Sequence, residues 1–180
     1  MTKSATFCIL PWVSLATNAS GNLRVCCNVI PGEGFIKKPE VDIESKINPY
    51  KIFKDNIQEA WNSETYTTLR KQMLAGERPE MCARCFKEED AGIVSSRQRW
   101  NNHKWNDPNK EYTADAPFDI KYVDIRLSNL CNLKCRMCNP YTANLWVKEW
   151  HLVNDALDPS EAERLSRMDW PTRDKVWENL

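Results

Sequence analysis

The sequence lacks a long apolar run and an excess of charge of either sign. Its 180 residues contain 25 lysines and arginines and 25 aspartates and glutamates, so no overall field would attract nucleic acid or an anionic membrane. No stretch reaches the roughly 18 consecutive apolar residues that cross a bilayer. Pro11, Ser14 and Thr17 interrupt the apolar residues that an N-terminal signal peptide would need. We therefore expect a soluble, cytoplasmic protein without a membrane or nucleic-acid partner.

Cysteine, in contrast, is abundant, with eight residues, whereas histidine occurs twice. A reducing cytosol does not maintain structural disulfides, so clustered cysteines there indicate metal binding or redox chemistry. A disulfide framework is the alternative, and it needs an export route that this N-terminus does not supply. His103 and His151 have no cysteine or acidic residue at a metal-binding spacing, and we interpret them as structural or exposed.

Residues 1–100 are predicted to form a small module that begins with a β-hairpin. Residues 12–17 and 23–29 have the composition of strands, and the residues between them favour a turn. The module is therefore of the α+β type, with helices after the hairpin.

Two helices of this module have recognisable ends. Asn48 and Pro49 provide a cap and a first-turn proline for the first helix. Ser63 is positioned to cap the second helix, and Gly76 occurs where a left-handed C-terminal residue is needed.

Residues 101–117 are polar and are predicted to link the module to a second unit, residues 118–180. Trp100 and Trp105, with the basic residues around them, could stack on nucleic acid, but the basic patch is short. We therefore favour a packed linker that covers the junction between the two units.

The second unit is predicted to start a repetition of strands and helices. Residues 120–128 alternate between apolar and polar side chains, as in a strand with one apolar face. Helices are expected to open at Asn139, at Asp158 and at Pro171. A strand followed by a loop and a helix is the unit of an α/β fold.

Three cysteines occupy the loop after this predicted strand, at Cys131, Cys135 and Cys138. Thiolates so close in sequence can converge on one face of an iron-sulfur cube. A 4Fe-4S cluster normally takes four cysteines, so three would leave one iron open to an external ligand. A zinc site is the alternative, but zinc sites usually combine two close pairs of ligands, and the gap from Cys85 to Cys135 is too long for a zinc ribbon.

The CxxxCxxC loop after a strand resembles the signature of the radical S-adenosylmethionine (radical SAM) superfamily. The resemblance implies that Cys131, Cys135 and Cys138 hold a 4Fe-4S cluster whose fourth iron binds S-adenosylmethionine, and that Met137 lies near the adenine, where the family usually has an aromatic residue. It also implies a 5′-deoxyadenosyl radical, a low-potential electron donor such as a flavodoxin or ferredoxin, and the start of a partial (β/α)6 barrel.

A second cysteine pattern precedes the first. Cys8 is followed by twelve residues, Gly21, four residues and Cys26, and then far downstream by Cys82 and Cys85. This pattern resembles the twitch module, the shorter relative of the SPASM domain. The resemblance implies that these four cysteines enclose an auxiliary 4Fe-4S cluster.

Cys27 is adjacent to one of these cysteines. Consecutive side chains of a strand point to opposite faces, so Cys26 and Cys27 cannot easily ligate one cluster. We predict that Cys26 is the ligand and that Cys27 is a small buried hydrophobic residue, although an exchange of the two roles stays open.

The two resemblances together predict a radical SAM enzyme that modifies a peptide, a protein or a small molecule. The chain has one convincing barrel strand and lacks the GGE-like segment that follows the second barrel strand in the family. We therefore expect an N-terminal portion of a longer enzyme, or a protein completed by another chain. The alternative is an iron-sulfur or zinc module for binding or electron transfer without catalysis. No catalytic side chain can be assigned.

Overall fold

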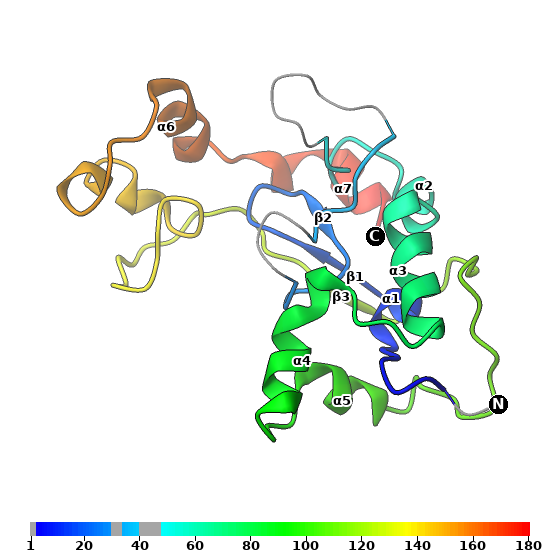
Figure 1. The fold of residues 1–180 in the computed structure, drawn as a ribbon. Coiled ribbons are helices and arrows are strands. Elements are labelled where there is room, and N and C mark those ends of the chain that lie inside the picture. The colour runs from blue at the N-terminus through cyan, green and yellow to red at the C-terminus, as the bar shows by residue number, and fades with distance from the viewer. Residues whose placement is uncertain (1–2, 30–33, 40–47) are drawn as a thin grey trace.

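The chain forms a mixed α/β structure, with one small sheet and several short helices (Figure 1). The computed structural model describes residues 3–29, 34–39 and 48–180. The strands lie in the order β2-β1-β3, and they are β1 Ser14–Thr17, β2 Leu23–Arg24 and β3 Tyr122–Asp124. The α-helices of the described residues are α1 Leu10–Val13, α2 Ile57–Trp61, α3 Glu64–Leu74, α4 Ala83–Asp90, α5 Ser96–Asn101, α6 Pro159–Ser166 and α7 Asp174–Glu178. Short 3₁₀ turns span Glu80–Cys82, Asn144–Trp146, Trp150–Leu152 and Trp170–Thr172.

The predicted hairpin is confirmed, with shorter strands than expected. β1 and β2 pair antiparallel. In the turn between them, the Asn18 side chain accepts hydrogen bonds from the backbone N–H groups of Ser20 and Asn22, both at 3.0 Å. Gly21 adopts a φ of 75°, a backbone conformation that favours glycine. Residues 12 and 13 belong to α1 instead of the strand, because Pro11 starts a helical turn directly before β1.

The prediction of a helix that begins at Asn48 is wrong. Tyr50 runs in an extended conformation beside β2, and its carbonyl accepts a hydrogen bond from the Leu23 N–H at 2.7 Å. This pairing satisfies backbone groups on the outer side of β2, which a helix at this position would leave unpaired. Helix α2 begins only after Asn56, whose side chain accepts a hydrogen bond from the Gln58 N–H at 2.8 Å.

The helix expected after Ser63 is confirmed as α3, although the Ser63 hydroxyl makes no capping hydrogen bond. Gly76 follows it with a φ of 82°. The N–H of Glu77 donates to the carbonyl of Gln72 at 2.9 Å, and the N–H of Gly76 donates to that of Met73 at 3.4 Å, which is the left-handed helix end that the glycine predicted. The helix buries four side chains: Tyr66, Leu69, Arg70 and Met73.

The predicted strand over residues 120–128 forms in part, as β3. It pairs in parallel with β1 of the hairpin. On either side of the paired residues, the Lys121 N–H donates to the Val13 carbonyl at 2.8 Å, and the Arg126 N–H donates to the Thr17 hydroxyl at 3.0 Å. The strand thus joins the sheet of the N-terminal module, and the described residues do not confirm the start of a partial barrel.

Aromatic side chains pack where β3 meets the preceding segment. The ring of Trp100 stacks on that of Trp105, with centroids 5.6 Å apart, and lies 4.6 Å from that of Tyr122. This contact agrees with the expected packed linker. The division into units at residues 100 and 118 stays a prediction.

The prediction of a helix that begins at Asn139 is wrong. The N–H groups of Thr142 and Ala143 both donate to the carbonyl of Asn139 at 2.9 Å, so one turn forms. The next N–H, that of Asn144, donates to the carbonyl of Asn129 at 2.8 Å. This long-range bond redirects the chain, and 3₁₀ turns follow in place of a helix.

Nearer the C-terminus, the helix start expected at Asp158 is confirmed, and the one expected at Pro171 occurs three residues later, at Asp174. The Asp158 side chain caps α6 by accepting from the N–H groups of Ser160 and Glu161. Pro171 lies in a 3₁₀ turn, and α7 follows it. Figure 1 shows α6 and the loop before it on one side of the molecule, away from α3 to α5. Among the described residues, no helix has the length and apolar character needed to span a membrane.

Candidate metal centres

Four cysteines line one cavity of the N-terminal module: Cys8, Cys26, Cys82 and Cys85. They come from three separate segments, and all of them are free thiols. The rest of the lining combines three apolar residues, Leu10, Val29 and Met73, with three polar ones, Asn28, Ser96 and Arg97. The fold therefore brings together the four cysteines that the sequence pattern grouped, whereas ligation of a cluster by them stays a prediction.

The chain supplies these thiols through three different local structures. Cys8 lies directly before α1, and the hydroxyl of nearby Thr6 donates to the Met73 carbonyl at the end of α3 at 3.2 Å. Cys26 follows β2. Cys82 ends a 3₁₀ turn, and Cys85 lies in the first turn of α4. A separation of three residues across a helix start places two side chains on one face, which explains the usefulness of the CxxC spacing.

The backbone favours the thiolate form of several of these cysteines. The N–H of Asn28 donates to Cys26 Sγ at 3.3 Å. The backbone at Leu10 lowers the pKa of Cys8, and the backbone at Arg97 lowers that of Cys85. Such bonds favour the thiolate, which is the form that binds metal. Hydrogen bonds to the sulfurs are also one of the means by which proteins adjust iron-sulfur clusters.

Without a metal, burial keeps these groups protonated. Burial raises the pKa of Cys8 well above its usual range, that of Cys26 to about 11 and that of Cys82 to about 12. The neighbouring thiols raise the pKa values of Cys8 and Cys82 further, because each thiolate would repel the next. A bound cation reverses this balance and deprotonates its thiol ligands.

The donor set fits an iron-sulfur cluster. It offers four thiols around one cavity, and the Asn28 N–H already donates to one of them, Cys26. Within residues 3–29, 34–39 and 48–180, no three or more His, Cys, Asp or Glu side chains are placed to hold a single metal ion. The thiols instead lie around a cavity.

Cys27 does not line this cavity, unlike its neighbour Cys26. Its thiol is half-buried. Burial and the neighbouring Asp124 carboxylate on β3 both raise the pKa of Cys27. Cys27 is therefore less buried than the sequence interpretation expected, and it lies near Asp124 instead of lining the cavity.

The second group, Cys131, Cys135 and Cys138, lies in the irregular loop between β3 and α6. Cys135 is exposed, and the other two are half-buried. Within this loop, the Cys138 N–H donates to the Cys135 carbonyl at 3.0 Å, and the Trp146 indole N–H donates to the same carbonyl at 3.2 Å. The Cys131 N–H donates to the Asn144 side chain at 3.3 Å, and Lys134 pairs with Glu149. Met137, expected beside an adenine, is 92% exposed.

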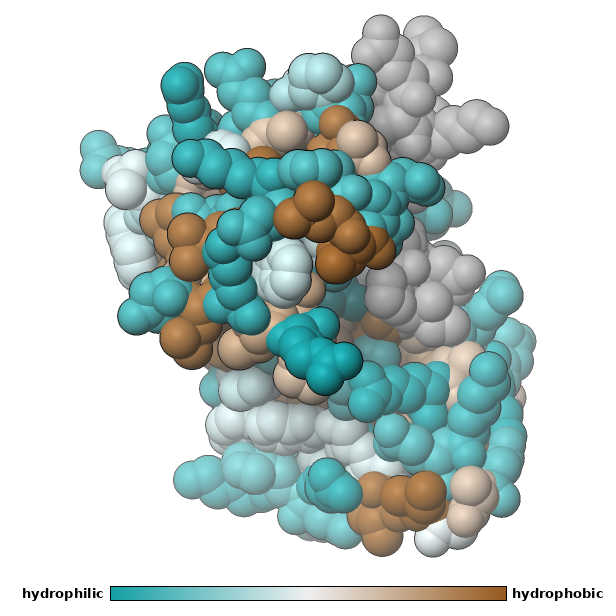
Figure 2. All heavy atoms as spheres, turned by 90° about the vertical axis from the view of Figure 1, so that its left-hand side faces the viewer, coloured by the Kyte–Doolittle hydropathy of each residue, from teal (hydrophilic) through white to brown (hydrophobic). Residues whose placement is uncertain are grey.

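The structure does not gather these three thiols around a common cavity in the described residues. An open depression beside Cys131 is lined by Asn132 and Leu145 among others, but not by Cys135 or Cys138. Figure 2 views the molecule from the side of this loop and α6, where apolar side chains stand among hydrophilic ones. The exposed apolar residues of this segment include Leu127, Leu130, Leu133, Leu145, Leu152 and Val153.

The sequence patterns did not indicate Arg97, a charged residue that also lines the four-cysteine cavity. It lies twelve positions after Cys85. Arginine is seldom buried, and nothing in its local sequence indicates that it faces the cysteines.

A comparison with known protein families supports an iron-sulfur role for the segment that contains the first group of cysteines. Residues 8–86 match the family model of SPASM, an iron-sulfur cluster-binding domain. The matched span begins at Cys8 and includes all four cysteines of the cavity, and it ends before the three-cysteine loop. No curated protein and no solved structure matched the chain.

Proposed function

We propose that the chain is part of a radical SAM enzyme, in which Cys8, Cys26, Cys82 and Cys85 hold an auxiliary 4Fe-4S cluster. The observation that carries this proposal is the cavity lined by four free thiols from three segments, all inside the span that matches an iron-sulfur cluster-binding domain. SPASM domains occur in radical SAM enzymes, which links the module to that chemistry.

Cys131, Cys135 and Cys138 are proposed to hold the second cluster. When bound there, a 4Fe-4S cluster with one open iron supplies the electron that cleaves S-adenosylmethionine to a 5′-deoxyadenosyl radical. The chain's own part is to present three thiolates on one loop and to leave space for the cosubstrate beside them. The exposure of Cys135 and Met137 supports such an open site.

The remaining parts of the reaction need partners. We propose a low-potential donor such as a flavodoxin or ferredoxin, a peptide, protein or small-molecule substrate, and further barrel strands from a longer chain or from a second chain. The peptide or protein class rests on the analogy with the auxiliary module alone. A cytoplasmic location, where thiols remain reduced, suits this chemistry.

A second candidate is an iron-sulfur or zinc module that transfers electrons or binds a partner without catalysis. The open three-cysteine loop supports this candidate, because catalysis with a radical needs a site that excludes water.

Anaerobic reconstitution of the 180-residue chain tests both candidates. Two four-iron clusters give about eight irons per chain, and tightly bound zinc in place of iron would overturn the cluster assignment. The reconstituted protein is then incubated with S-adenosylmethionine and dithionite. Formation of 5′-deoxyadenosine supports the enzyme. Full iron content without that product supports the non-catalytic module for this chain.

A further inference from the structure

Arg97, on α5, is a buried cation at the edge of the four-cysteine cavity. Arg97 is 7% exposed, and it lines the cavity together with the cysteines. Its backbone lowers the pKa of Cys85, and its side chain carries a positive charge beside the cavity that the four thiols line.

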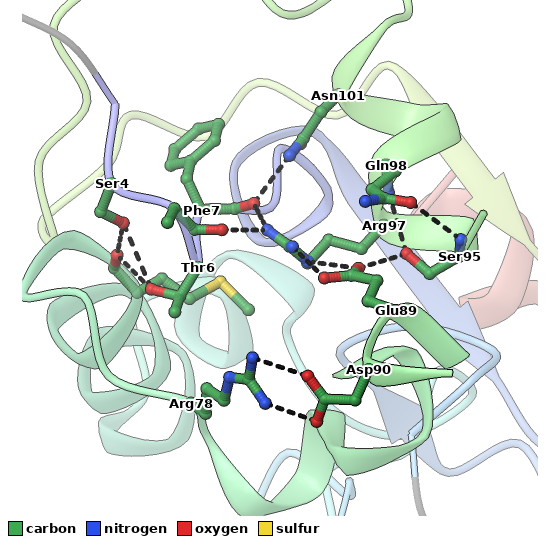
Figure 3. Close-up of polar contacts among 12 residues, drawn as sticks. Ser4, Thr6, Phe7, Arg78, Glu89, Asp90, Ser95, Arg97, Gln98 and Asn101 are labelled. Carbon is green, nitrogen blue, oxygen red and sulfur yellow. Dashed lines mark hydrogen bonds and ion pairs between the residues drawn. The ribbon is translucent and has the colours of Figure 1, made fainter. Parts of the chain in front are cut away.

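The guanidinium is held in place by contacts on several sides (Figure 3). Nη1 donates to the carbonyls of Ala5 and Phe7, at 2.9 and 2.7 Å. Nε donates to the Glu89 carboxylate at 2.9 Å, and Nη2 donates to the other oxygen of that carboxylate. Such a two-pronged ion pair fixes both the position and the direction of the charge.

Glu89, on α4, is in turn oriented by α5. The Ser95 hydroxyl hydrogen-bonds to it, and Ser95 also caps α5 by accepting from the Gln98 N–H at 3.1 Å. Burial alone would raise the pKa of Glu89, but the hydrogen bonds from Arg97 and Ser95 lower it overall, so the carboxylate is charged at neutral pH. The pair thus places two opposite charges beside the cavity.

Both charges act on the cysteines. The Arg97 charge lowers the pKa values of Cys82 and Cys85, against the larger effect of burial, and the Glu89 charge raises that of Cys85. Charges in partly buried surroundings act with little screening. Neither residue contributes a thiol, and their charges add to that of Glu88, which also raises the pKa of Cys85.

We propose that the Arg97–Glu89 pair sets the reduction potential of a cluster bound in the four-cysteine cavity, with Arg97 favouring the reduced state and Glu89 opposing it. This inference rests on the proposed function. Reduction adds one electron, and thus one negative charge, to a cluster that four thiolates already make negative. A nearby cation therefore favours reduction, and net charge is one of the known determinants of cluster potentials. Arg97 is a positioning residue and does not ligate iron.

The test is a potentiometric titration of the reconstituted 180-residue chain with dithionite, in the presence of redox mediators and at constant pH. Arg97→Gln removes the cation and leaves Glu89 unpaired, so the potential falls. Glu89→Gln leaves the cation unpaired, so the potential rises. We expect each change to alter the reduction equilibrium at least tenfold, which is about 59 mV for a one-electron couple.

Two variants separate charge from structure. Arg97→Lys keeps the charge and loses the fork of hydrogen bonds, so the potential stays near that of the parent chain even if iron content falls. Arg78→Gln removes an arginine that also pairs with α4, through Asp90, but on the surface with side chains 54% and 56% exposed. Solvent screens that pair. We therefore expect Arg78→Gln to change the reduction equilibrium of the cluster by less than about twofold.

Iron content separates failure of this inference from failure of the proposed function. A parent chain that binds no iron would refute the cluster itself. With iron bound, shifts of the same sign in Arg97→Gln and Glu89→Gln, or no shift in either, would overturn the inference. Loss of iron in both variants would overturn it as well, since the pair would then only support the fold.

Discussion

The two groups of cysteines differ in how completely the chain encloses them. In the first group Cys8 is 6% exposed and Cys85 is 9% exposed, Cys26 and Cys82 are half-buried, and all four share one cavity with Leu10, Val29 and Met73. Cys135, in contrast, is exposed, and Met137 beside it is 92% exposed. The difference teaches that close spacing in sequence does not by itself build a site: the widely separated thiols lie around one cavity, and the closely spaced ones do not.

The contrast follows from where the supporting contacts lie. The thiols of the first group belong to segments packed on the central core, which includes the residues around α1 and α3. The three-cysteine loop is instead held at its base by Asn129, whose buried side chain donates to the carbonyls of Pro140 and Leu165 at 2.8 and 2.7 Å. One site is supported by the core, whereas the loop of the other depends on hydrogen bonds at its base and on a few within the loop.

The largest expected effect is on iron content. Cys8→Ser removes a thiolate from the enclosed site, so we expect the reconstituted chain to lose about four of its about eight irons. Cys135→Ser is expected to remove the other four. Iron is measured per chain after gel filtration.

Cys27→Ser is the matched control for that experiment, since Cys27 adjoins Cys26 without lining the cavity. It is expected to retain all of the iron. Loss of iron in Cys27→Ser together with full iron in Cys26→Ser would show that Cys27, and not Cys26, is the cluster ligand.

The next effect concerns thiol reactivity after iron has been removed with a chelator. Cys135 is expected to react with iodoacetamide at neutral pH at least tenfold faster than Cys82, because burial raises the pKa of Cys82 to about 12 and each unit lowers the thiolate fraction tenfold. Peptide mapping by mass spectrometry gives both rates. Equal rates would show that the cavity opens when metal is absent.

The third prediction concerns Asn129, whose side chain holds the base of the three-cysteine loop. Asn129→Ala leaves the two buried carbonyls without their donor, and we expect the free energy of unfolding to fall by about 2 kcal/mol. Hydrogen exchange is expected to increase across residues 128–145 and to stay unchanged in α3 and α4. Asn132→Ala, at an exposed position of the same loop, is the control and should change neither measurement. Faster exchange in α4 would show that the two regions are coupled.

The smallest expected effect is on the pH dependence of stability. The pKa of Glu89 lies below its ordinary value of 4.5, since the hydrogen bonds from Arg97 and Ser95 outweigh burial. Its stabilising contribution is therefore present above pH 4.5 and is lost as the pH falls through the lower, folded-state pKa. Urea unfolding between pH 6 and pH 3 is expected to show a shallower loss of stability in Glu89→Gln than in the parent chain. Parallel curves would contradict this contribution.

Local signals in the sequence correctly predicted several elements. The asparagine- and glycine-rich turn gave the hairpin, Ser63 and Gly76 bounded α3, and Asp158 capped α6. Each of these signals acts within a few residues, so no distant contact is needed to form the element. The helices expected at Asn48 and Asn139 failed because hydrogen bonds to distant residues, Leu23 and Asn129, gave those segments another conformation.

The sequence by itself determined which residues could do metal chemistry: eight cysteines in two spaced patterns, the first of them within the span that matches an iron-sulfur cluster-binding domain. Only the tertiary structure decided that Cys26 faces the cavity while Cys27 lies near Asp124, and that Arg97 and Glu89 place charges beside the thiols. The physical reason is range. Spacing along the chain sets which thiols can be neighbours locally, whereas burial, charge and hydrogen bonding at a site depend on segments that meet only after folding.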